Sequence, residues 1–131
     1  MAAEIRRVQV NVRMMDEYDP ILVNAFTTPT AGLVVHPSRR IYVERGVARY
    51  VRRRNHWSIS IYPIGVRVFS GIPTREQAEE IIAIHLTGYQ WVGLFEADIF
   101  ATNDRDKLKE MGRNVRKIIQ KQREALGLEL E

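Results

Sequence analysis

The chain has 131 residues, of which 45% are hydrophobic and 27% are charged. This composition is typical of a single soluble domain with its own apolar core and argues against a disordered chain. The absence of cysteine excludes disulfide scaffolds, thiolate nucleophiles and zinc sites that use sulfur.

The positive charge is concentrated in two segments. Residues 39–54 contain seven arginines and one acid, and residues 105–123 contain eight basic residues and two acids, so each segment carries +6. Because the whole chain is only +4, the remainder carries −8. This separation is typical of a protein that binds a polyanion, and nucleic acid is the polyanion that we expect. The first segment has arginine and no lysine, which favours bidentate contacts to phosphates and base edges.

No segment approaches the roughly 20 apolar residues that a transmembrane helix needs. Residues 1–12 carry charges where a signal peptide would need an apolar region. We therefore expect an intracellular, cytoplasmic protein that binds no membrane, located in the host cytoplasm if the protein is viral.

Strict alternation of apolar and polar residues predicts a first strand at residues 8–14. A turn at 16–20 leads to a more fully buried strand at 21–26, and an irregular loop at 27–32 precedes a short strand at 33–35. His36, Pro37 and Ser38 are expected to end that strand.

Residues 40–69 predict an antiparallel meander. The first two strands, at 41–44 and 47–52, are joined by a turn at Arg45-Gly46. A second turn at 54–56 precedes a strand at 57–61. A third turn at 63–65 leads to a strand at 66–69. If Trp57, Ile59 and Ile61 face a helix, the opposite face presents Tyr42, Tyr50, Arg52, Ser58, Ser60 and Arg67. These side chains suit groove binding or base stacking; the alternative is an ordinary solvated sheet face.

Two helices complete the expected fold. The capping-box sequence Thr74-Arg75-Glu76-Gln77 predicts a packing helix at 74–87, with His85 on its apolar face. The aromatic segment 89–100 predicts a further strand or a buried loop. A long helix at 103–126, capped by Asn103 or Asp104, carries a narrow apolar stripe that would dock on the sheet or pair with a second copy in a homodimer. The predicted class is α+β, an antiparallel meander sheet with two helices in one domain, residues 1–131.

Part of the meander resembles a known DNA-binding family. The run Trp57-x-Ile59-x-Ile61, a turn through Gly65, and then Arg67, Gly71, Thr74 and Ala78 resembles the sheet-then-helix unit of Apetala-type and tyrosine-integrase arm-binding domains. The resemblance covers about residues 49–86 and leaves out the N-terminal strands and the final helix. In that family a three-stranded sheet enters the DNA major groove, which implies the same role for Arg52, Arg54, Trp57 and Arg67 here.

The sequence therefore predicts a non-enzymatic nucleic-acid-binding protein, with DNA favoured over RNA, of the small regulatory or accessory kind found in viruses and mobile elements. The residues expected to bind nucleic acid are Arg39, Arg40, Arg45, Arg49, Tyr50, Arg52, Arg53, Arg54, Trp57, Arg67, Arg113, Arg116 and Lys117. No catalytic residue, metal site or cofactor is expected. Two alternatives remain: a homo-oligomeric structural or assembly protein, and a metal-dependent nuclease that uses Asp98, Asp104 or Asp106.

Overall fold

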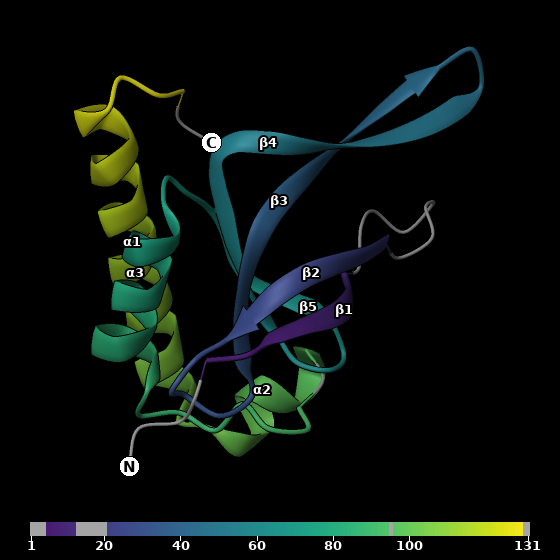
Figure 1. Ribbon diagram of the computed structural model, residues 1–131. Coiled ribbons are helices and arrows are strands. Elements are labelled where there is room, and N and C mark those ends of the chain that lie inside the picture. Colours follow the sequence, from purple (N-terminus) through teal and green to yellow (C-terminus); the bar gives the residue numbers. More distant parts are fainter. Residues whose placement is uncertain (1–4, 13–20, 95, 130–131) are drawn as a thin grey trace.

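The computed structural model describes residues 5–12, 21–94 and 96–129 and has the predicted α+β class (Figure 1). Its antiparallel sheet has the strand order β1-β2-β3-β4-β5. The strands are β1 (Arg7–Val12), β2 (Ile21–Thr27), β3 (Leu33–Glu44), β4 (Val47–Ile61) and β5 (Val66–Ile72). The helices are α1 (Arg75–Ile81), the π-helix η1 (Ile82–Leu86), α2 (Glu96–Thr102) and α3 (Arg105–Ala125). The predicted turn at 16–20, with Arg13 and Met14 before it, lies outside the described residues.

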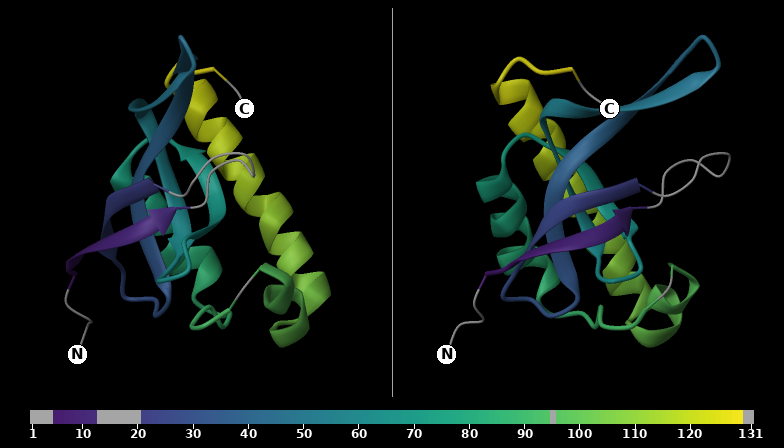
Figure 2. Two further views of the ribbon diagram at one scale, coloured as in Figure 1. Left: turned by 90° about the vertical axis from the view of Figure 1, so that its right-hand side faces the viewer. Right: turned by 45° about the vertical axis from the view of Figure 1, so that its right-hand side comes forward.

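The two central strands are longer than the sequence predicts. β3 and β4 pair from Leu33–Ile61 to Glu44–Val47, and the breaks expected at 36–38 and 54–56 are wrong. A register shift between Pro37 and Arg39, and a φ of 53° at Asn55, bend the strands without ending them. The outer half of this hairpin, residues 40–51, projects from the body as a two-stranded ribbon that we call the β-arm (Figures 1 and 2).

The turn at the tip of the β-arm is as predicted. Arg45 and Gly46 both have positive φ, 51° and 78°. Two consecutive residues of this kind make the tight turn whose twist matches that of the flanking strands.

The sheet is covered on both faces. On one face α1, η1 and α3 bury Ile59, Ile61 and Ile72 in the main core. On the other face the β1–β2 hairpin lies across β3 and forms a second core, made of Val10, Val12, Val23, Ala25 and Val34 (Figure 2). The β4–β5 turn touches this hairpin so closely that a Cβ on Gly65 would lie 1.8 Å from the carbonyl oxygen of Asn11. Only glycine fits there, which fixes the position of the hairpin on the sheet.

The helix starts follow the sequence. The Thr74 hydroxyl accepts a hydrogen bond from the backbone N–H of Gln77 at 3.1 Å, and helical structure continues to Leu86. Of the two residues expected to cap α3, Asp104 does so: its Oδ1 accepts from the backbone N–H groups of Asp106 and Lys107 at 3.0 and 3.1 Å. Both caps therefore satisfy backbone donors that have no partner within the helix.

Segment 89–100 is not a strand. Residues 87–94 form a loop in which Trp91 is buried and donates from Nε1 to the carbonyl oxygen of Leu86 at 2.8 Å. Gly93, within the aromatic and apolar segment, has a φ of 71°, which is not the conformation of a strand. Residues 96–102 then satisfy their backbone hydrogen bonds locally as α2 and not through the sheet.

The apolar stripe of α3 docks within the chain. Leu108, Met111, Val115 and Ile119 are buried in the main core, and α3 contacts β5 and η1. The stripe that a coiled-coil partner would need is thus covered; homodimer formation stays a prediction. No helix in the described ranges combines the length and apolar character needed to cross a bilayer.

Candidate nucleic-acid interface

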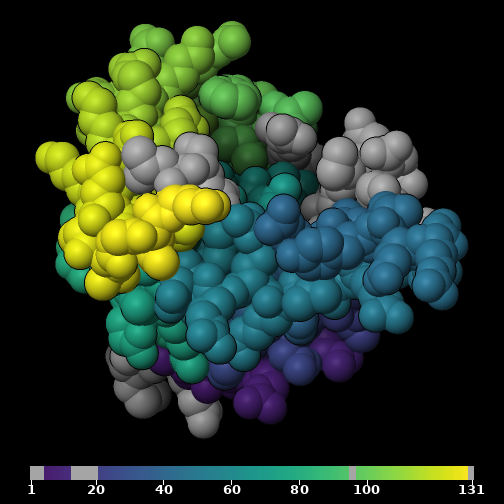
Figure 3. Space-filling model, turned by 90° about the horizontal axis from the view of Figure 1, so that it is seen from above, coloured from purple at the N-terminus to yellow at the C-terminus, as the bar shows by residue number. Residues whose placement is uncertain are grey.

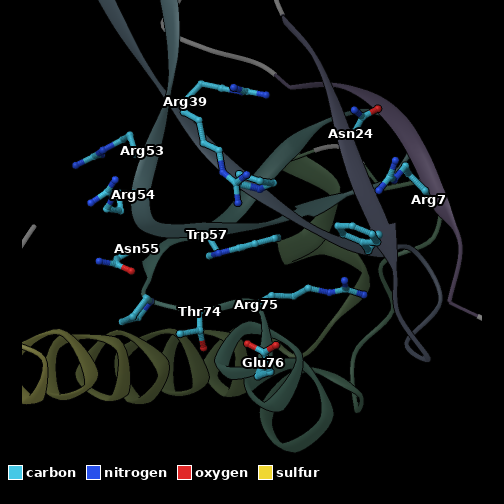
Figure 4. Close-up of a pocket in the computed structure, with 14 residues that line it drawn as sticks. Arg7, Asn24, Arg39, Arg53, Arg54, Asn55, Trp57, Thr74, Arg75 and Glu76 are labelled. Carbon is cyan, nitrogen blue, oxygen red and sulfur yellow. The ribbon is translucent and has the colours of Figure 1, made fainter.

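A cleft of about 820 Å³ opens between the β1–β2 hairpin, the base of the β-arm and the start of α1 (Figure 4). Its walls are rich in guanidinium groups, and Glu76 is the one acidic side chain among them. The lining residues are Arg7, Asn24, Phe26, Pro37, Arg39, Arg52, Arg53, Arg54, Asn55, Trp57, Pro73, Thr74, Arg75 and Glu76. We call this cavity the arginine cleft.

The cleft exists because β2 and β3 separate. They pair only at Phe26–Val35 and Thr27–Val34, so beyond these residues a gap opens between β2 and the base of the β-arm. Arg39 lies just past the register shift of β3, opposite Arg52 of β4. Figure 4 shows Arg39, Arg53 and Arg54 on one side and Arg7 and Asn24 on the other, with Trp57 between them.

Within the described residues, some arginines of the cleft have a carboxylate partner and others do not. Arg75 forms an ion pair with Glu79 of α1, at 2.8 Å between Nε and Oε1. Arg39, Arg52 and Arg54 form no ion pair with any carboxylate in the described part of the chain. Because like charges gathered in a concave surface focus the field, the cleft attracts anions strongly.

Two aromatic rings hold some of these arginines in place. The guanidinium of Arg75 lies 3.7 Å from the centre of the Phe26 ring, and that of Arg7 lies 5.7 Å from it. Arg52 lies 5.7 Å from the ring centre of Trp57, which is half-buried against the main core. These cation–π contacts reduce the freedom of the arginines before any ligand binds.

The β-arm carries further cations on an open face. Three cross-strand pairs share this face and are exposed: Arg40–Val51, Tyr42–Arg49 and Glu44–Val47. The guanidinium of Arg40 lies 5.0 Å from the centre of the Tyr42 ring. Tyr50 points to the other face, paired with Ile41, and is half-buried. Seen from above in Figure 3, the β-arm (blue) reaches one side of the molecule, and the C-terminal end of α3 (yellow) lies on the opposite side.

The expected open face at Ser58 and Ser60 is wrong. Both serines are fully buried, because the β1–β2 hairpin covers that part of the sheet. Ser60 Oγ lies 2.8 Å from Nε2 of His36, and Ser58 Oγ lies 2.6 Å from Oγ of Ser38. These side chains form a polar layer inside the protein and are not available to a ligand.

His36 is the ionisable member of this layer. Its Nδ1 lies 3.1 Å from the carbonyl oxygen of Pro37 and donates to it, so Nε2 accepts from the Ser60 hydroxyl. The pKa of His36 is lowered to about 4, chiefly by burial. The hydrogen bond to Pro37 opposes this shift, and the charges of Arg67 and Arg39 add to it. The imidazole is therefore neutral at physiological pH.

The remaining predicted residues lie outside the cleft. Arg67 is exposed and lines a small separate pocket with His36 and Arg39. Arg113, Arg116 and Lys117 are exposed on α3, where Arg116 lines a groove with residues 68–71 of β5. The structure thus gathers Arg39, Arg52, Arg53, Arg54 and Trp57 in one cavity and places the α3 cations elsewhere.

Arg123, a member of the second basic segment, is not a surface cation. It is 6% exposed and donates from Nη1 to the carbonyl oxygens of Asn55 and Gly71, each at 3.0 Å. Its Nε donates to the carbonyl oxygen of Glu129 at 2.7 Å. This side chain fastens α3 to the bend of β4 and to the end of β5.

The cleft lining includes residues that the sequence does not mark as binding residues, among them Arg7, Asn24, Phe26 and Arg75. Arg7 lies on the polar side of the alternating first strand, and Asn24 lies in a strand that the sequence predicts to be more fully buried. Arg75 belongs to a capping box. Nothing in their local pattern marks them, because only the divergence of β2 from β3 brings them beside the central arginines.

The structure gives Asp104, one of the acids considered for metal binding, a role in the fold. Asp104 uses Oδ1 to cap α3. Within the described ranges no three His, Asp or Glu side chains gather closely enough to hold a metal ion.

Comparison of the chain with protein-family models, with curated proteins and with solved structures gave no match. The resemblance to Apetala-type and tyrosine-integrase arm-binding domains therefore stays a prediction. Of the residues to which it gives DNA contacts, Arg52, Arg54 and Trp57 line the cleft, whereas Arg67 does not.

Proposed function

We propose that this protein binds DNA, without chemistry of its own, through the β-arm and the arginine cleft at its base. The observation that most supports the proposal is that all seven arginines of residues 39–54 lie on one hairpin, either along the β-arm or in the cleft walls. Arg40 and Arg49 share the exposed face of the β-arm, whereas Arg39 and Arg52 line the cleft at its base. A polyanion that runs from the β-arm to the cleft can contact both groups.

The β-arm has a suitable shape for this role. The major groove of B-DNA, about 12 Å wide, admits a two-stranded ribbon. Arg40, Arg45 and Arg49 supply forks for phosphates or base edges, while Tyr42 and Val47 on the same exposed face supply apolar contact. In this arrangement the β-arm lies in the groove and the base of the hairpin lies against the backbone.

A salt titration of binding to duplex DNA tests the proposal. Neutralising about six phosphates predicts a slope of log K against log salt near −5. The double variant Arg45→Asn/Arg49→Gln removes two cations, and Asn-Gly is a favoured tight-turn pair, so the β-arm keeps its shape. We expect its slope to be less negative by about 1.8.

The matched control is Lys107→Gln/Lys109→Gln, which removes the same charge from exposed positions in the first turns of α3. Its slope should equal that of the wild type. Two results would contradict the proposal: affinity for duplex DNA at low salt weaker than ordinary non-specific binding, or equal slopes for the β-arm variant and the wild type.

The β-arm also favours a second candidate, an assembly role. Its strands 40–44 and 47–51 pair only with each other among the described residues, and Val43 and Val47 are about 60% exposed. Open edges with apolar side chains can pair with another chain. Sedimentation without nucleic acid separates the two functions, because a concentration-dependent oligomer that Val43→Lys abolishes would favour assembly.

A further inference from the structure

The arginine cleft is too small for a duplex. Its volume of about 820 Å³ is within the range of pockets that hold a drug-sized ligand. A turn of double helix is far larger than this volume, so it cannot enter whole. A single nucleotide chain, whose units are of drug size, can.

The walls of the cleft come from three separate elements. Arg7 and Asn24 approach from the β1–β2 hairpin, Arg39 and Arg54 from the base of the β-arm, and Arg75 from the start of α1 (Figure 4). A strand lying in the cleft would meet guanidinium groups on both sides. Arg39, Arg52 and Arg54 have no carboxylate partner among the described residues, and phosphate oxygens are strong acceptors for guanidinium groups.

The cleft also offers a stacking surface. Phe26 is already engaged by Arg7 and Arg75, but Trp57 lies in the middle of the cleft and is half-buried against the core behind it. The guanidinium of Arg52 lies 5.7 Å from the centre of the Trp57 ring, so a base would stack on the indole in place of this contact. Asn24 and Asn55 line the same cavity and can donate to or accept from a base edge.

We propose, on the premise that this protein binds nucleic acid, that the arginine cleft holds a single-stranded segment. Its phosphates lie on Arg39, Arg52 and Arg54, and one of its bases stacks on Trp57. With duplex on the β-arm and a single strand in the cleft, the protein would engage a junction between the two.

Tryptophan fluorescence can test this directly. The chain has two tryptophans, and Trp91 is 1% exposed, hydrogen-bonded to Leu86 and outside the cleft lining. A base that stacks on Trp57 should therefore quench only that residue. We expect an oligothymidylate of about ten nucleotides to quench the wild type. Trp57→Phe should lose the quenching but keep most of the affinity, measured by anisotropy of a labelled strand, because a phenyl ring still stacks.

The charged walls are tested with Arg52→Gln/Arg54→Gln. The salt slope for the oligothymidylate should become less negative by about 1.4, at 0.7 per phosphate of a single strand. The control is again Lys107→Gln/Lys109→Gln, whose slope should not change.

Thymidine 5′-monophosphate and inorganic phosphate complete the experiment. Equal affinity for the mononucleotide and the oligonucleotide would overturn the single-strand assignment in favour of a nucleotide site. Quenching that persists in Trp57→Phe, or unchanged slopes in the arginine variant, would overturn the placement in the cleft. If these tests fail but the salt slope for duplex DNA still changes in Arg45→Asn/Arg49→Gln, only the single-strand inference has failed. If the duplex titration fails but oligothymidylate still quenches Trp57, the duplex proposal has failed and the single-strand inference stands.

Discussion

Arg123 shows that a cation in a basic segment can serve the fold alone. Its guanidinium is buried and binds three carbonyl oxygens, those of Asn55, Gly71 and Glu129. Arg123→Leu would leave these acceptors without their donor, which we expect to lower the free energy of unfolding by about 3 kcal/mol. Urea denaturation measures this change. Arg113→Leu, on an exposed face of the same helix, should stay within about 0.5 kcal/mol of the wild type, and equal losses for both variants would contradict the role of Arg123.

His36 predicts a specific dependence of stability on pH. Its pKa is about 4 in the folded protein and 6.5 when unperturbed, so between these values the unfolded state binds more protons. The stability is complete above pH 6.5 and falls as the pH is lowered towards 4, by about 3 kcal/mol in total. His36→Gln cannot titrate in this range. The difference between the unfolding free energies of the wild type and this variant should therefore shrink from pH 7 to pH 4, and a constant difference would contradict the assignment.

At the scale of the element, the bend of β4 shapes the cleft. Asn55 has a φ of 53° and lines the cleft, and its carbonyl oxygen accepts a hydrogen bond from Arg123. Asn55→Val places a β-branched residue in the left-handed region and should lower the unfolding free energy by about 2 kcal/mol. Asn55→Gly keeps the backbone and should be nearly neutral. Thermal melts of the two variants decide this, and similar melting temperatures would mean that the bend tolerates any residue.

The same bend explains which elements the sequence could predict. The alternation of apolar and polar residues predicted most strands, and the capping residues predicted the starts of α1 and α3. Both signals depend only on residues close together in the sequence. The breaks expected at His36-Pro37-Ser38 and Arg54-Asn55-His56 were wrong because β3 and β4 both continue through a register shift. The register passes from Pro37–Trp57 to Arg39–Arg52 and skips residues 53–56 of β4, of which Asn55 has positive φ. Nothing local distinguishes a bent strand from two strands and a turn.

The sequence predicted only those site residues that lie close together along the chain. Arg39, Arg52, Arg53, Arg54 and Trp57 lie within one short stretch, so their density revealed them. Ser58 and Ser60 alternate with apolar residues as a wet face would, but the β1–β2 hairpin covers them. That cover is a tertiary contact between distant segments, and alternation cannot tell a solvated face from a buried polar layer.

At the scale of the whole molecule, the two basic segments contribute unequally. The first forms the β-arm and the cleft walls. The second lies on α3, where Arg123 alone approaches the cleft, through the carbonyl oxygen of Asn55. Arg116 precedes Arg123 by seven residues, which is about 10 Å along a helix. At physiological salt the Debye length is about 8 Å, so Arg116 and Lys117 contribute little to the field in the cleft.

This separation gives a prediction for the α3 cations, which the sequence analysis placed in the interface. Arg116→Gln/Lys117→Gln should change the affinity for duplex DNA less than threefold at physiological salt and leave the salt slope unchanged. Arg45→Asn/Arg49→Gln removes the same charge from the β-arm and should lower the affinity more, with a slope less negative by about 1.8. Filter binding over a range of salt concentrations measures both. Equal changes in slope for the two variants would mean that the nucleic acid wraps from the β-arm around to α3, and that both basic segments bind it together.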